Sequence, residues 1–189
     1  VPATAGIPLT HRGFASTVGI LTGHEDPRKG MGAIQWGSLA RGCDTLVCLM
    51  AVKTLPELVQ RLIQEGRSAA TPAAVIERGT WPIQRTVTGT LGSVIRRAQS
   101  QQIQPPAILV VGDVVRLRDQ LAWFERRALW GLRVLVTRAA AKADFLAQRL
   151  EDLGAVAQRL PAIELAPMPR SSRLAQAIRS GGSGSPTTD

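Results

Sequence analysis

The residues of this sequence that could do chemistry are mainly arginines. Only three of its 23 basic residues are lysines, and the formal net charge is +9. Two stretches set arginines directly against short apolar runs: GIPLTHR at 6–12, which also contains His11, and VVGDVVRLRDQLAWF at 110–124. A guanidinium group holds a carboxylate through two parallel hydrogen bonds. We therefore expect the chain to bind anions, among which phosphates, polycarboxylates and nucleic acid are the alternatives.

Other kinds of chemistry find little support in the sequence. The arginines are scattered, with no block of five or more like charges, which does not favour a nucleic-acid-binding tail. The two histidines, His11 and His24, form neither a Ser-His-Asp constellation nor a metal site. Cys43 and Cys48 also lack metal-ligand spacing, and we interpret them as buried free thiols in a reducing compartment. No apolar run approaches ~18 residues, so we expect no membrane span.

Alternating strand and helix patterns predict the α/β elements that would position these residues. A helix after Thr54 has a T-x-x-E capping box with Glu57 and ends at Gly66. Thr90 is expected to cap a second helix, which Pro105 breaks, and 117–127 is expected to be helical. Residues 23–32 are expected to form a loop. Strands are predicted at 16–22, 45–52, 73–76, 81–89 and 107–115.

A second unit begins near residue 131. Strand patterns at 132–137 and 155–165 flank a helix at 140–153, which predicts a β-α-β unit with parallel strands. The expected apolar face of that helix consists of Ala143, Leu146, Leu150 and Leu153. The composition of the last residues is that of a linker and flexible tail.

Several dissimilar motifs resemble, in order and with similar spacing, the carboxyl half of the uroporphyrinogen-III C-methyltransferases, a group of tetrapyrrole methylases. The resemblance covers residues 1 to about 125. LVTR at 135–138 and PAIEL at 161–165 resemble the start of uroporphyrinogen-III synthase. The methylase-like motifs are AGIPLTHR (5–12), TGH (22–24), IERGT (76–80), QRTVTGTL (84–91) and ILVVGDVVRLRDQLAWF (108–124).

The resemblance implies an α/β fold in three parts. Residues 1–129 would be the carboxyl lobe of a tetrapyrrole methylase, with a mixed sheet and flanking helices. Residues 131–167 would be a truncated, synthase-like β-α-β unit, and 168–189 a linker and tail. The family's glycine-rich cofactor loop lies upstream of Val1. We therefore expect a fragment of a larger bifunctional, cytoplasmic enzyme of siroheme or cobalamin formation, homodimeric when intact and with little activity alone.

The resemblance also implies a cofactor and a substrate. The family transfers methyl groups from S-adenosylmethionine to uroporphyrinogen III, giving precorrin-2. By position, Met50, Gly79, Ala107 and Ile108 match cofactor-contacting residues. For Met50 the alternative is core packing, and for Gly79 a simple turn.

Uroporphyrinogen III carries eight carboxylates, so its cleft should be rimmed by arginines. Candidates for its binding are Arg12, Arg85, Arg116 and His11. The alternatives are solvated surface arginines and a structural histidine. No catalytic residue is identified, and no metal is expected. A chain that only binds tetrapyrrole carboxylates, without catalysis, is the alternative function.

Overall fold

The computed structural model describes residues 1–23 and 34–164. The predicted loop beyond Gly23, with His24, and the predicted tail at 168–189 lie outside these residues. The first part is a five-stranded sheet in the order β1-β2-β5-β3-β4, in which only β1 and β2 run parallel. It is therefore a mixed sheet, as expected. The strands are β1 (Val18–Thr22), β2 (Thr45–Leu49), β3 (Pro72–Glu77), β4 (Arg85–Thr90) and β5 (Ala107–Val111).

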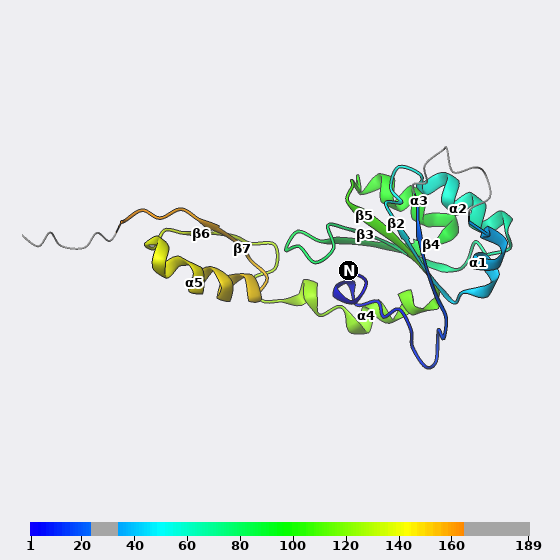
Figure 1. Cartoon of the computed structure of the whole chain (residues 1–189), viewed down its shortest axis with the longest axis horizontal. Helices are drawn as coiled ribbons and strands as arrows, with labels where there is room; N and C mark the ends of the chain where they lie inside the picture. The colour runs from blue at the N-terminus through cyan, green and yellow to red at the C-terminus, as the bar shows by residue number, and fades with distance from the viewer. Residues whose placement is uncertain (24–33, 165–189) are drawn as a thin grey trace, which may run out of the picture.

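The sheet is covered on both faces (Figure 1). Helices α1 (Trp36–Gly42), α2 (Leu55–Gln64) and α3 (Leu91–Ser100) pack on one face, with Ala73 and Val75 of β3. The amino-terminal segment, with the short helix η1 (Ala3–Ala5), and η3 (Asp113–Leu117) pack on the other, against Ala74 and Ile76. Alternate residues of β3 thus enter different cores, as the period of two in a strand requires.

Of the two N-terminal helix caps predicted from the sequence, one is present in the structure and the other is not. Thr90 caps α3 as predicted, and Ser93 completes a capping box. The capping box predicted for Thr54 and Glu57 is wrong, because the Thr54 hydroxyl donates instead to the carbonyl of Gly23, at 2.5 Å. A partner distant in sequence has replaced the local one.

The sequence did not predict α1, whose carboxyl end is held from outside the helix. The guanidinium of Arg67 donates to the carbonyl oxygens of Ala40 (3.0 Å), Cys43 (2.5 Å) and Asp44 (2.6 Å). These include carbonyls that a helix leaves without internal partners. A helix of seven residues is marginal by itself, so this distant arginine supplies support that local periodicity does not reveal.

Several predicted elements are shorter in the structure, among them the strands predicted at 45–52 and 107–115, which end at Leu49 and Val111. The strand predicted at 81–89 begins only at Arg85, because residues 78–84 form consecutive turns closed by Trp81 N–H to Arg78 O and Gln84 N–H to Trp81 O. The helix predicted at 117–127 is reduced to α4 (Arg118–Leu121) and η4 (Phe124–Arg126). Phe124 is buried there, but Trp123 is 59% exposed and is not a core residue.

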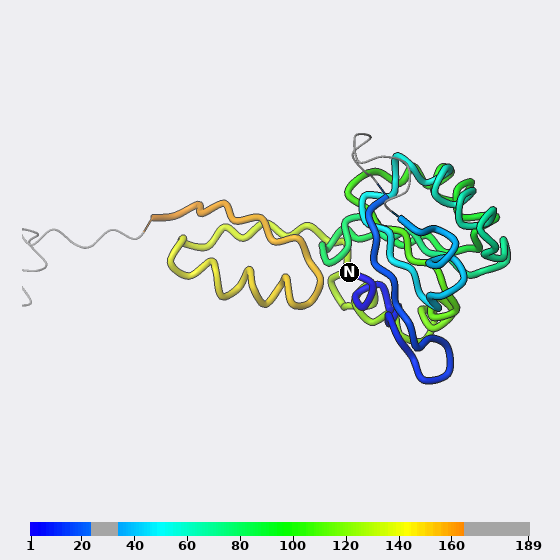
Figure 2. Tube along the Cα trace, turned by 45° about the vertical axis from the view of Figure 1, so that its right-hand side comes forward, coloured from blue at the N-terminus to red at the C-terminus, as the bar shows by residue number. Residues whose placement is uncertain are grey.

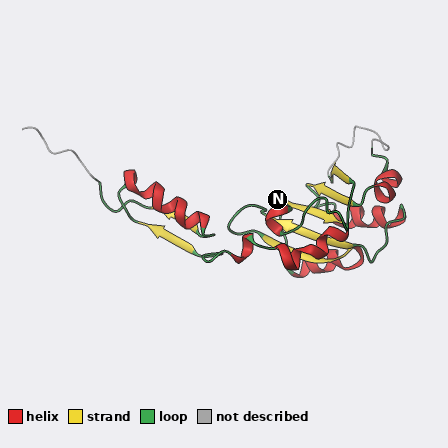
Figure 3. Cartoon of the chain, turned by 90° about the horizontal axis from the view of Figure 1, so that it is seen from below, coloured by secondary structure: helices red, strands yellow, loops and turns green. Residues whose placement is uncertain are grey.

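The second unit consists of β6 (Arg133–Val136), α5 (Ala140–Asp152) and β7 (Val156–Arg159), with the two strands parallel. Ala143 and Ala147 of α5 are buried against Val136, whereas Leu146 and Leu153 of the predicted face are exposed. Small side chains let the helix approach the narrow sheet closely. Figures 2 and 3 show this unit beside the five-stranded sheet, joined to it by the segment that contains η4.

The start of β1 is held by one carboxylate. Asp44 Oδ2 accepts hydrogen bonds from the backbone N–H groups of Ser16 (2.8 Å) and Thr17 (3.0 Å), and from the Thr17 hydroxyl. Hydrogen bonds to the charged form lower the pKa of Asp44 below its ordinary value of 3.8. The contribution of this carboxylate to stability is therefore complete above pH 3.8 and is lost as pH falls through the lower, folded-state pKa.

Replacement of Asp44 by alanine should lower the urea midpoint of unfolding at neutral pH, because three donors lose their acceptor. The difference from the unchanged chain should shrink as pH falls through the lowered, folded-state pKa of Asp44, because protonation then removes the charge that these donors stabilise. Asp119→Ala, which removes an exposed carboxylate from α4, is the control. Equal midpoints for the Asp44 and Asp119 variants at neutral pH would contradict the assignment.

Candidate functional site

A cavity of about 690 Å³ opens at one edge of the five-stranded sheet. The carboxyl ends of β2 and β3 and the amino end of β5 meet at this edge, because β5 runs antiparallel between the other two. Its volume lies within the range of small-molecule sites. The lining residues are Val1, Leu49, Met50, Val52, Lys53, Ile76, Arg78, Gly79, Trp81, Pro105, Pro106, Ala107 and Ile108.

The four residues assigned to the cofactor by resemblance all line this one cavity. Met50 follows β2, Gly79 follows β3, and Ala107 and Ile108 begin β5. The strand register brings the last two into place, since Ile108 lies opposite Ile76 and Ala107 opposite Glu77. Three segments distant in sequence thus form one wall. The role of these residues in binding a cofactor stays a prediction.

The backbone around the cavity is strained. Met50, Arg78 and Thr80 have positive φ angles of 55°, 47° and 76°, a left-handed conformation that residues other than glycine rarely adopt. Each such residue costs on the order of 1 kcal/mol, and these conformations gather at ligand sites. No sequence pattern indicated this strain, because none of the three is a usual left-handed residue.

The charge lining the cavity is positive. Lys53 and Arg78 are its charged residues, and no Asp or Glu lines it among the described residues. The nearby carboxylate of Glu77, 1% exposed, accepts a hydrogen bond from Arg85 Nε at 2.7 Å and forms an ion pair with the same guanidinium. Glu77 Oε1 also lies 4.0 Å from Arg78 Nε, so this carboxylate is shared between two arginines, and the lining keeps a net positive charge that can attract an anionic group of a ligand.

None of the four residues predicted to bind the substrate lines the cavity. Arg85, besides binding Glu77, donates to the carbonyl oxygens of Gln101 and Gln102. Arg116 pairs with Asp113 at 3.1 Å on the surface. The Arg85 guanidinium therefore has internal partners that a substrate carboxylate would have to displace, whereas Arg116 is exposed and uses only its Nε in the surface pair.

His11 and Arg12 lie in an exposed turn that the His11–Ala15 bridge closes. His11 Nδ1 accepts a hydrogen bond from the Gly13 N–H at 3.1 Å, and the ring lies 5.2 Å from that of Phe14. This is the structural alternative considered for His11. Arg12 has no ion-pair partner in the described part of the chain, so its guanidinium is the one of the predicted set that is free to bind an anion.

The remaining predictions concern metals, membranes and thiols. Within residues 1–23 and 34–164, no group of three or more His, Cys, Asp or Glu side chains is placed to hold a metal ion. None of the helices in that part has the length and apolar character for crossing a membrane. Both cysteines are free, but only Cys48 is buried as predicted, and Cys43 is half-buried. Burial raises the pKa of the Cys48 thiol to about 12.

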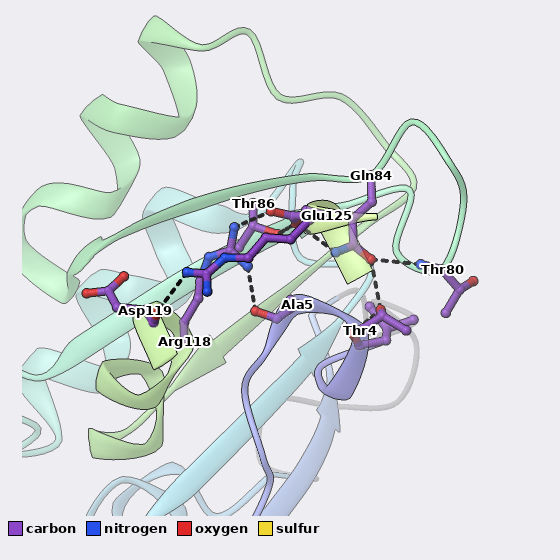
Figure 4. A network of polar contacts seen from close by, with 10 residues as sticks. Thr4, Ala5, Thr80, Gln84, Thr86, Arg118, Asp119 and Glu125 are labelled. Atoms are coloured by element: carbon purple, nitrogen blue, oxygen red, sulfur yellow. Dashed lines mark hydrogen bonds and ion pairs between the residues drawn. The ribbon is translucent and has the colours of Figure 1, made fainter. Parts of the chain in front are cut away.

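A polar network (Figure 4) contacts Thr80, which directly follows the cavity-lining residues Arg78 and Gly79. The buried side chain of Gln84 bonds to the Thr80 N–H and to Glu125, and Glu125 in turn pairs with Arg118. Neither Gln84 nor Glu125 was predicted from the sequence. Two features of the sequence could have pointed to them. Gln84 is a polar residue directly before Arg85 of the strand, and Glu125 is an acid directly after the apolar pair Trp123-Phe124.

Comparison with known proteins identifies the family. Residues 1–95, just over half of the chain, match the family model described as tetrapyrrole (corrin/porphyrin) methylases. The chain belongs to the tetrapyrrole methylase family. The mixed sheet, with its cavity at the strand ends, is therefore part of a tetrapyrrole methylase fold.

Among the relatives of this tetrapyrrole methylase chain is the uroporphyrinogen-III C-methyltransferase of Bacillus subtilis (strain 168), 43% identical over 82% of this chain and 32% of that protein. The porphyrin biosynthesis protein HemD of Ruminiclostridium josui is 37% identical over 89% of this chain and 33% of that protein. A solved structure, uroporphyrin-III C-methyl transferase from Thermus thermophilus complexed with S-adenyl homocysteine, has 33% identity and a TM-score of 0.50. It covers 60% of this chain and 49% of that one.

The chain spans about a third of the two curated relatives and about half of the solved tetrapyrrole methylase. It is a homologue of uroporphyrinogen-III C-methyltransferases. The activity of the whole relatives belongs to longer chains than the one described.

The strain at Thr80 leads to a stability prediction. Asparagine tolerates a positive φ better than the β-branched threonine, and the exposed Thr80 side chain makes no hydrogen bond in the described structure. Thr80→Asn should therefore raise the free energy of unfolding by up to about 1 kcal/mol in urea denaturation. Thr88→Asn, at a position in β4, is the control and should not be stabilising. A less stable Thr80→Asn chain would show that the threonine is not strained.

Proposed function

We propose that this chain forms one wall of the S-adenosylmethionine site of a uroporphyrinogen-III C-methyltransferase. One observation carries the proposal: Met50, Gly79, Ala107 and Ile108, from three distant segments, line a single cavity. Family membership and the S-adenyl homocysteine bound to the Thermus thermophilus relative support it. The longer relatives would supply the remaining wall.

The residues of the cavity fit the parts of such a ligand. Ala107 and Ile108 offer an apolar surface for an adenine ring. Lys53 and Arg78 offer cations for the carboxylate of the methionine portion. At Gly79 the space is restricted, since a Cβ there would overlap the Val1 side chain. A glycine therefore lets the backbone lie against Val1, which also lines the cavity.

The bound donor would supply a methyl group on a positively charged sulfur. This displacement needs alignment of the reacting atoms more than a strong base. The contribution of this chain is to bind and orient. Its apolar residues exclude water, and its cations fix one end of the ligand. The surrounding structure holds the strained left-handed residues, so the cavity wall has one conformation before binding. No described residue is assigned as a proton donor or acceptor in the reaction.

The names of the relatives and the arginines of this chain support a proposal for the substrate. The Bacillus subtilis relative is a uroporphyrinogen-III C-methyltransferase, and we infer the same octacarboxylate substrate here. Arg12 is the leading candidate for binding it, because its guanidinium has no described ion-pair partner. Arg85, Arg116 and His11 have internal or neighbouring partners and rank behind it.

The finer organisation also belongs to the proposal. Residues 1–129 would be the methylase lobe and 131–167 the start of a uroporphyrinogen-III synthase-like unit. In support, the Ruminiclostridium josui relative aligns over 169 residues, further than the methylase family model. A β-α-β arrangement at 133–159 is compatible with this assignment. Cytoplasmic location, homodimerisation of the whole enzyme and a place in siroheme or cobalamin formation remain parts of the hypothesis.

Calorimetry with two ligands tests the proposal. S-adenosylhomocysteine should bind the chain, and Lys53→Gln should weaken that binding about tenfold, the loss of one charged contact. Methylthioadenosine, which lacks the carboxylate, should bind both chains equally. Lys142→Gln, with the same change of charge on α5, is the control and should leave both affinities unchanged.

The same experiment includes outcomes that would contradict the proposal. Failure of the unchanged chain to bind either adenosine ligand would remove the cofactor site. Binding of uroporphyrin alone would instead support the alternative function, a module that holds tetrapyrrole carboxylates without catalysis. An equal loss for both ligands in Lys53→Gln would show that Lys53 does not contact the carboxylate.

A further inference from the structure

The turn that forms the cavity wall is held from behind by one side chain. Gln84 is 3% exposed, and its Oε1 accepts hydrogen bonds from the Thr80 N–H (2.9 Å) and the Thr4 hydroxyl (2.8 Å). Thr80 directly follows Arg78 and Gly79, which line the cavity. The orientation of the Gln84 amide therefore bears on the strained conformation of residues 78–80.

A carboxylate sets that orientation. Gln84 Nε2 donates to Glu125 Oε1 at 2.8 Å, and the Thr86 hydroxyl donates to the same oxygen at 2.8 Å. The other oxygen, Oε2, accepts from Arg118 Nη2 at 2.5 Å. An ionised carboxylate accepts and never donates, so it can face only the NH₂ side of the Gln84 amide. The amide oxygen is thereby directed towards Thr80.

Arg118 in turn fixes the carboxylate. Its second nitrogen, Nη1, donates to the carbonyl of Ala5 at 2.5 Å, and both partners of the Arg118–Glu125 pair are largely buried. A partly buried carboxylate without this partner would carry a desolvation cost. The donors and acceptors of the network consequently fit one arrangement, from Ala5 through Arg118, Glu125 and Gln84 to Thr80 (Figure 4).

We propose that Glu125 and Gln84 are positioning residues for the cavity: the charge of Glu125 selects the amide orientation of Gln84, which holds residues 78–80 in their strained conformation. Neither residue lines the cavity. The consequence for ligand affinity rests on the proposed function, whereas the consequence for the turn does not.

Glu125→Gln is the decisive variant, because it preserves size and removes one acceptor. The introduced amide would turn its only oxygen to the charged Arg118, leaving its NH₂ to face Gln84. Gln84 would then flip its own oxygen towards that NH₂ and present its NH₂ to the Thr80 N–H, so that two donors face each other.

The double variant Gln84→Glu/Glu125→Gln should restore the arrangement. Its introduced carboxylate accepts hydrogen bonds from the introduced amide, from the Thr80 N–H and from the Thr4 hydroxyl.

Amide hydrogen exchange of Thr80, measured by NMR on the full chain without ligand, tests the inference directly. Glu125→Gln should accelerate exchange about fivefold or more, as expected for loss of one hydrogen bond, and the double variant should restore protection. Thr86→Val is the matched control: it removes a donor to the same Glu125 oxygen but leaves Gln84 in place, and Thr80 exchange should not change. If Glu125→Gln does not fold, Gln84→Met, which retains the carboxylate, should accelerate exchange in the same way.

Unchanged Thr80 protection in a folded Glu125→Gln or Gln84→Met chain would overturn the inference, as would a folded double variant without rescue. Affinity for S-adenosylhomocysteine provides the second measurement. It should fall several-fold in Glu125→Gln and recover in the double variant. If the unchanged chain fails to bind this ligand, the proposed function fails, and the exchange data still decide whether the network positions the turn.

Discussion

The ion pair between Glu77 and Arg85 is the interaction on which the geometry of the site depends. A carboxylate that is almost wholly buried requires a charged partner, and Arg85 lies directly opposite it on β4. A shift of one residue between β3 and β4 would bury the acid without its arginine and exchange the two faces of the strand. The pair therefore favours a single register. In that register Ile76 and Arg78, on either side of Glu77, line the cavity.

This constraint extends across the sheet. β3 is fixed by β4 on one side and pairs with β5 on the other, and β5 continues the ladder to β2. The ends of these strands hold backbone conformations that an isolated peptide would rarely adopt. Regular pairing in the strands thus supports irregular backbone at their ends. A site formed in this way is organised in advance, which lowers the ordering cost when a ligand binds.

Patterns that are local in sequence could be predicted, and contacts between distant residues could not. Apolar periodicity located α2, α3 and all five strands of the first sheet, and Thr90 marked a true cap. The helix α1 escaped prediction because its end is held by Arg67, 25 residues beyond its last residue, Gly42. The expected cap at Thr54 failed because its hydroxyl has a partner 31 residues away.

In the candidate site, too, contacts between residues distant in sequence could not be predicted. Resemblance, not spacing, selected Met50 and Gly79, and the strand order then brought them to one cavity. Arg85 has the sequence appearance of a surface arginine, yet it neutralises a buried acid. Glu125 and Gln84 are 41 positions apart, so no local pattern joins them.

In the segment after α4, residues that are close in sequence form contacts with both units. Glu125 is bound to the first unit, while Arg127 stacks on Phe124, 3.9 Å from its ring centre, and donates to the carbonyls of Glu151 and Asp152 at the end of α5. Only Arg126 separates the two sets of contacts. One inserted residue adds up to about 3.5 Å of chain, more than a hydrogen bond can stretch. Natural variation in the length of the connection between the two units should therefore be absent at 125–127 and begin only beyond it.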